Sequence, residues 1–223
     1  MILLSTAIPA QIYPIFGIKL IAIFIGFTFW RKFDISYRLI FIHLLIALVV
    51  EALGLYLNYI KQPNNFWLFN IYMIIEVWLI GLAGKYFLQD KLSDRYILIS
   101  LIGFSVYWII SFKYKPITSL LNVFFILTFF FLVAVYIAVL VKKTFINNNV
   151  FNDPLFYLCV SCILYFACLI PLLGLINYLF SNNMKAAFNL FYISHILNFL
   201  RYSLVAVAFY LYGSQVKRGY VRQ

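Results

Sequence analysis

Apolar runs of about 20 residues recur along the whole chain and are separated by short polar breaks. A helix rises about 1.5 Å per residue, so a run of this length can cross a hydrocarbon core of about 30 Å. The breaks are rich in Asn, Asp, Pro and Lys, which favour turns and helix ends, and Asp153 before Pro154 has the residue types of a helix start. The pattern predicts seven transmembrane helices, over residues 11–30, 37–60, 66–88, 95–112, 117–141, 154–180 and 186–213.

Composition supports this prediction. The 223-residue chain is 66% hydrophobic and 10% charged, whereas a soluble domain carries about 25% charged residues. We therefore expect an all-α membrane protein, a single seven-helix transmembrane domain over residues 1–223, with the lipid bilayer as its surroundings. The net charge of +11 does not indicate nucleic acid, because the basic residues flank apolar runs instead of gathering on one polar arm. The first residues lack the basic region and cleavage site of a signal peptide, so we expect the first span to be retained.

The loops differ in their content of Lys and Arg, which predicts the orientation. Alternate breaks and the carboxyl-terminal tail carry eleven basic residues on one side and four on the other. Cytoplasmic loops retain the excess of basic residues. The sequence therefore predicts an amino terminus outside the cell and a cytoplasmic carboxyl terminus. The richer side has Arg31, Lys32, Arg38, Lys85, Lys91, Arg95, Lys142, Lys143, Lys217, Arg218 and Arg222; the other has Lys61, Lys113, Lys115 and Lys185.

Four charged residues fall in predicted spans away from the span ends: the bases Lys19 and Arg201 and the acids Glu51 and Glu76. Each central charge costs about 2.5 to 3.5 kcal/mol of insertion free energy, so the four together would cost on the order of 10 kcal/mol if unpaired. A cost of that size requires pairing, protonation or water. Ionisable residues within membrane spans commonly mark ligand sites or proton pathways, and these four are our first candidates.

The helical rise and periodicity suggest how these residues meet. The rise places Lys19, Glu51, Glu76 and His195 in one layer near the midplane, with His43 and Arg201 about 10 Å closer to the cytoplasmic side. We therefore expect a polar cavity walled by the first, second, third and last spans, with the fourth to sixth as scaffold, and we expect His43 to be structural. Residues one turn away on the same faces complete the candidate ligand- or proton-binding set: Lys19, Glu51, Tyr72, Glu76, His195, Asn198 and Arg201.

The sequence gives less support to thiol, metal, catalytic or retinal sites. Cys159 and Cys162 have C-x-x-C spacing in the middle of a span without a second pair, so we expect thiol packing. Two histidines without an H-x-x-x-H pair predict no metal site, although a site built from Glu51, Glu76 and His195 stays an alternative. We expect no catalytic residues and no cofactor, and retinal is excluded because position 201 is Arg where an imine would need Lys.

The third span contains Asn70, Tyr72 and Glu76 in an NxYxxxE pattern. With the seven-helix layout, this resembles a set of uncharacterised bacterial membrane proteins, some of which resemble detached sensor modules of histidine kinases. The resemblance implies a cytoplasmic signalling partner such as a histidine kinase, and no chemistry. We expect an inner-membrane sensor that binds a small ligand, lipid or proton. A proton-coupled transporter or ion pathway, a lipid-modifying enzyme and a structural role remain alternatives; the lack of an inverted repeat disfavours the transporter.

Overall fold

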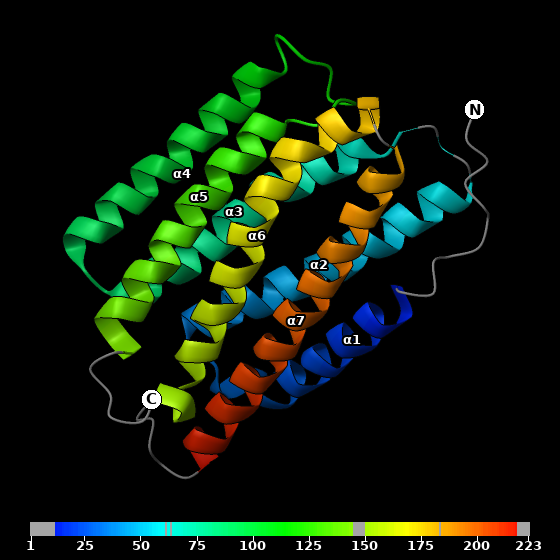
Figure 1. Cartoon of the computed structure of the whole chain (residues 1–223). Coiled ribbons are helices and arrows are strands. Elements are labelled where there is room, and N and C mark those ends of the chain that lie inside the picture. The colour runs from blue at the N-terminus through cyan, green and yellow to red at the C-terminus, as the bar shows by residue number, and fades with distance from the viewer. Residues whose placement is uncertain (1–11, 61, 63, 145–149, 183, 218–223) are drawn as a thin grey trace.

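The computed structural model describes residues 12–60, 62, 64–144, 150–182 and 184–217, and over these residues the fold is all helical (Figure 1). Each of its seven α-helices contains a segment long and apolar enough to span a membrane, as predicted. The helices are α1 (Ile12–Phe29), α2 (Ile35–Tyr59), α3 (Phe66–Leu88), α4 (Lys91–Ser111), α5 (Asn122–Val139), α6 (Pro154–Asn182) and α7 (Met184–Lys217).

The start of α5 differs most from the prediction: the helix begins at Asn122 instead of residue 117. The preceding residues form a turn whose carbonyl groups bind a side chain of α3. Asn70 Nδ2 donates to the Ile117 oxygen at 2.8 Å and to the Ser119 oxygen at 2.9 Å. The apolar run thus enters helix only after this turn. The other six helices begin and end within four residues of their predicted bounds.

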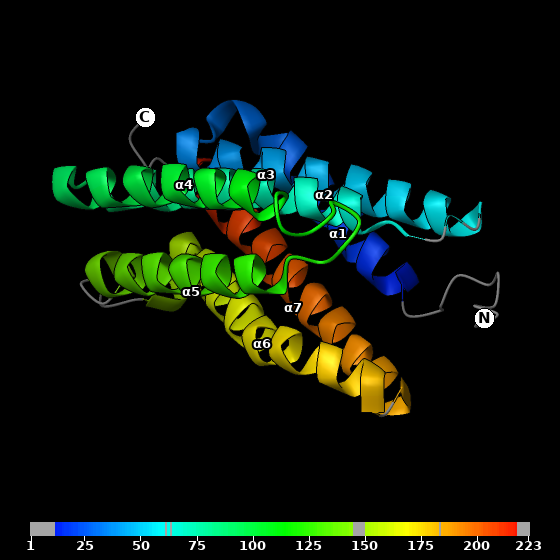
Figure 2. The same ribbon diagram turned by 90° about the horizontal axis from the view of Figure 1, so that it is seen from above.

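Six of the helices pack in a closed ring, in the order α1, α7, α6, α5, α3, α2 and back to α1. Seen from above, α2, α3 and α4 form one layer and α5 and α6 another, with α7 crossing obliquely between them (Figure 2). The remaining helix, α4, packs outside the ring against α3 and α5. Only Ile97 and Leu101 of α4 are buried, so the interior of the bundle belongs to the ring helices.

Two aspartates fix helix starts at the end of the bundle where α7 terminates. Asp34 Oδ1 accepts a hydrogen bond from the Tyr37 amide at 3.0 Å and caps α2. Asp153 Oδ1 accepts one from the Leu155 amide at 2.9 Å, and Pro154 begins α6. This confirms the helix start predicted at Asp153, because the carboxylate satisfies an amide that has no partner within the helix.

Small residues bring α1 close to its neighbours. A Cβ added at Gly26 would clash with the ring of Phe41 on α2 and would lie 3.2 Å from the ring of Phe209 on α7. One turn earlier, Ala22 is fully buried. Since Lys19 lies on the same face of α1, this close approach carries its side chain into the interior, where it is also fully buried.

Candidate functional site

Glu76 of α3 lies at the centre of a buried polar network. Its Oε1 is 2.9 Å from an Arg201 guanidinium nitrogen on α7 and 3.1 Å from His43 Nε2 on α2. His43 Nε2 is also 2.8 Å from the Tyr72 hydroxyl, one turn before Glu76. Because a carboxylate only accepts hydrogen bonds, we assign the Nε2 proton to His43, which donates it to Glu76. Glu76, His43 and Arg201 are each 3% exposed, so these three side chains are buried, whereas Tyr72 is partly buried.

The guanidinium of Arg201 also packs on aromatic rings of α6. Its central carbon lies 4.2 Å from the ring centroid of Tyr165 and 4.9 Å from that of Phe166. Such cation–π contacts are favourable where the cation has lost its water. We expected the sixth span to be mostly scaffold, and this was wrong, because α6 forms one wall of the network. Nothing in its uniformly apolar sequence distinguishes these two rings.

A second ion pair joins Lys19 of α1 to Glu51 of α2, with 2.5 Å between Nζ and Oε1. The two side chains differ in exposure: Lys19 is 0% exposed and Glu51 is 28% exposed. Among the described residues, Glu51 is the one acid in an ion pair with Lys19. The buried ammonium therefore depends on an acid that the surroundings of the bundle can reach.

Tyr202 of α7 connects the two ion pairs. Its ring centroid lies 4.2 Å from Lys19 Nζ and 5.9 Å from the Arg201 guanidinium carbon, and the side chain is 2% exposed. A movement of either cation thus changes the packing of one buried ring. The adjacent positions 201 and 202 bring both pairs to the same turn of α7.

The two glutamates do not meet in one group as expected. Glu76 contacts His43 and Arg201 directly, although the rise per residue placed those two about 10 Å closer to the cytoplasmic side. Backbone depth omits the reach of side chains, and an Arg side chain is long enough to close most of that gap. Lys19 pairs with Glu51 instead, so the acids divide between two bases.

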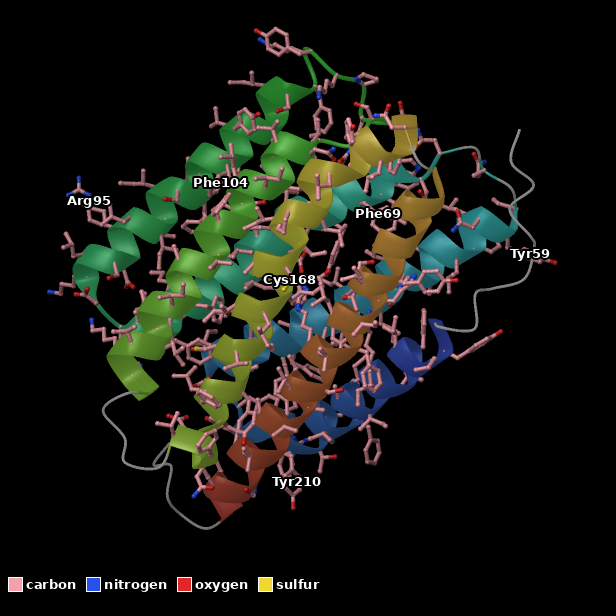
Figure 3. All side chains as sticks on the ribbon, viewed as in Figure 1. Tyr59, Phe69, Arg95, Phe104, Cys168 and Tyr210 are labelled. Carbon is pink, nitrogen blue, oxygen red and sulfur yellow. The ribbon has the colours of Figure 1, made fainter. Side chains whose placement is uncertain are left out.

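The interior beside these residues contains almost no free space. The free space beside His43, Arg201 and Tyr202 is about 10 Å³, which is about the minimum for one water molecule. Side chains of the described residues project from neighbouring helices into the spaces between the ribbons (Figure 3). The predicted polar cavity is therefore a packed ionic cluster in this conformation.

Two candidate residues of α7 remain, His195 and Asn198. His195 of α7 is partly buried and experiences the charge of Glu51. Asn198 is partly exposed, and it makes no hydrogen bond or ion pair with a residue that the structure describes. The structure thus brings His195 toward the pair and leaves Asn198 outside both groups.

The cysteines follow the predicted packing. Cys159 and Cys162 are buried and Cys168 is exposed, and all three are free thiols. Within the described part of the chain, no three His, Cys, Asp or Glu side chains form a group that could hold a metal ion. The alternative of a metal site built from Glu51, Glu76 and His195 therefore has no geometric support there.

Comparisons with protein-family models, with curated proteins and with solved structures found no match. The functional argument therefore rests on the two ion pairs and their surroundings.

Proposed function

We propose that this chain is a sensor in a bacterial inner membrane, with its amino terminus outside and its carboxyl terminus in the cytoplasm. The orientation is supported by the eleven-to-four distribution of basic residues between alternate loops. A reporter enzyme fused after Gln223 tests it: a reporter active only in the cytoplasm should be active, and activity of a periplasmic reporter at that position would reverse the orientation.

One observation carries the proposal: a fully buried Lys19 is neutralised by a Glu51 that is 28% exposed. Protonation of Glu51, or displacement of its carboxylate by an anionic ligand group, breaks the pair without the stimulus having to enter the bundle. A buried charge that loses its partner destabilises a structure by about 3 to 5 kcal/mol. Protonation therefore favours rearranged packing around α1, whereas an anionic ligand would replace Glu51 as the partner of Lys19.

The rearrangement has a route to the other end of the bundle. Lys19 contacts the ring of Tyr202, which sits next to Arg201 on α7, the longest helix. A shift of α7 would move its last described turn and the basic residues near it. We propose that a cytoplasmic partner, such as a histidine kinase, detects this movement.

The proposal is tested by the response of helix packing to pH in the purified protein. Amide exchange rates in α1 and α2, divided by the intrinsic rate at each pH, should increase in the wild type as Glu51 is protonated. Glu51→Gln should show the faster corrected exchange at every pH. Asp94→Asn is a matched control, since its ion pair with Lys85 is long, at 3.9 Å, and its side chain is 36% exposed. An exchange profile for Glu51→Gln that follows the wild type at all pH values would reject the sensor mechanism.

A proton-coupled transporter is the second candidate, favoured by the buried cluster in which the Tyr72 hydroxyl and the Glu76 carboxylate both contact His43 Nε2. Titratable groups inside membrane spans commonly mark proton pathways. Liposomes loaded with a pH-sensitive dye distinguish the two functions. A transporter should move protons and lose that flux in Glu76→Gln, while a sensor should show no flux in either protein.

A further inference from the structure

A cleft of about 240 Å³ opens at the end of the bundle where α7 terminates, at the lower left of Figure 1. We call it the end cleft. It is lined by the start of α2, the end of α3, the start of α6, the end of α7 and the π-helix Leu140–Thr144 that follows α5. It is separate from both ion pairs, because Lys19, Glu51, Glu76 and Arg201 do not line it. Nothing in the proposed sensor mechanism uses it.

The walls of the end cleft combine carboxylates with aromatic rings. Asp34 and Asp153 supply the acids, and Tyr37, Phe87 and Tyr212 supply rings. The Tyr37 ring packs against Tyr212, with 4.2 Å between centroids, and edge-on against Phe87 at 5.5 Å. Carboxylates beside aromatic faces are the surroundings that organic ammonium groups prefer.

The side chain of Tyr37 lines the cleft and is 3% exposed. Its hydroxyl forms no hydrogen bond with a residue that the structure describes. By contrast, the Tyr212 hydroxyl accepts a hydrogen bond from the Asp34 amide at 3.3 Å. The Tyr37 hydroxyl is therefore available to a polar group bound in the cleft.

The charged residues of the cleft also match a ligand that carries both a positive and a negative charge. Both acids cap helices through one carboxylate oxygen, and both side chains also line the cleft. The cleft wall withdraws the carboxyl group of Asp34 from part of its water, and this desolvation raises its pKa from the usual 3.8. A bound cation would offset that loss of hydration. Lys143 adds one positive charge to the lining and forms no ion pair with an acid in the described part of the chain.

We propose that the end cleft binds a zwitterionic phosphoamine group, a primary ammonium with a phosphate two carbons away. The ammonium lies between Asp34 and Asp153 against the ring of Tyr37, and Lys143 contacts the phosphate. The cleft lies at an end of seven membrane-length helices, where the headgroups of aminophospholipids carry this group. Free phosphoethanolamine has the same chemistry.

Titration calorimetry on the full chain in a neutral detergent tests the proposal. The probes are phosphoethanolamine and short-chain phosphatidylethanolamine, with ethanolamine and inorganic phosphate as half-ligands. Either complete probe should bind saturably and at least about tenfold more tightly than each half-ligand, since each half makes only part of the charged contacts. Tighter binding of the lipid identifies a lipid headgroup as the source, and equal binding identifies the free compound. Neither complete probe binding saturably would overturn the site.

Variants that keep the helix caps make the test specific. Asp34→Asn and Asp153→Asn retain the capping oxygen and should each weaken binding by about tenfold. Lys143→Gln should reduce the affinity for phosphoethanolamine to about the affinity for ethanolamine. Tyr37→Phe should weaken binding by about fivefold without changing the melting temperature of the unliganded protein, because its hydroxyl has no partner there.

Asp90→Asn is the matched control, because Asp90 lies outside the cleft lining. The Ser93 hydroxyl donates to its carboxylate at 2.8 Å, and this hydrogen bond lowers the pKa of Asp90. Its replacement should leave binding of the probes unchanged. An equal loss in Asp90→Asn and Asp34→Asn would show a general charge effect and overturn the proposal.

Discussion

Replacing Glu76 by glutamine removes the negative charge from the buried network and keeps nearly the same shape. The amide oxygen can still accept a hydrogen bond from His43, so the main loss is the charge that faces Arg201 at 2.9 Å. Arg201 is 3% exposed and cannot return to water without moving α7. The variant therefore isolates the cost of an unpaired guanidinium in the interior.

The expected loss follows from this geometry. Removing one partner of a buried ion pair costs about 3 to 5 kcal/mol of unfolding free energy. Arg201 retains its contacts with the rings of Tyr165 and Phe166, and these offset part of the lost attraction. We therefore expect Glu76→Gln to lower the stability by about 3 kcal/mol.

Reversible unfolding in mixed micelles of increasing sodium dodecyl sulfate fraction, followed by far-ultraviolet circular dichroism, measures this loss. Asp94→Asn breaks a partly exposed pair and should cost less than about 1 kcal/mol. Combining Glu76→Gln with Arg201→Met removes the unpaired charge, so the double variant should be more stable than Glu76→Gln alone. A loss in Glu76→Gln no larger than that in Asp94→Asn would refute the reasoning.

Three further predictions follow from packing and capping, each measured as a change in thermal unfolding of the purified protein. Gly26→Val should destabilise by about 1 to 3 kcal/mol because its side chain meets Phe41, whereas Gly103→Val, with no atom within 4 Å, should be nearly neutral; equal effects would contradict the close helix approach. Asn70→Ala should cost about 1 to 3 kcal/mol through its two lost hydrogen bonds, and Asn182→Ala, at an exposed site, should cost less. Asp34→Ala should cost about 1 kcal/mol while Asp34→Asn retains the cap of α2; an equal loss in both would assign the effect to charge.

The seven helices were predictable because membrane-length apolar runs and the polar breaks between them are properties of the local sequence. The start of α5 was not, since it depends on hydrogen bonds from Asn70, which lies 47 residues before Ile117. The helix start at Asp153 was predictable for the opposite reason: the capping oxygen binds an amide two residues away.

For the candidate site, the helical periodicity indicated which charged residues face the interior. It did not indicate which of these residues form ion pairs. The pairing of Glu76 with Arg201 depends on side-chain length and on the lateral order of the helices, neither of which a rise per residue contains. His43 was predicted to be structural from its depth alone, yet it contacts Glu76. Tyr165 and Phe166 gave no signal, because aromatic residues are common in every span of this chain.

The central claim is that α1 and α2 separate when the pair of Lys19 and Glu51 breaks. Spin labels at Tyr13→Cys and Tyr59→Cys report this directly, because both native side chains are exposed, at 62% and 74%, and both lie at the end of the bundle where α1 begins. The three native cysteines are replaced by alanine in this background. We expect Glu51→Gln to lengthen the distance between the two spin labels, measured by double electron–electron resonance at neutral pH. Acidification should lengthen the same distance in the wild-type background. Identical distance distributions for the two proteins at every pH would contradict the central claim.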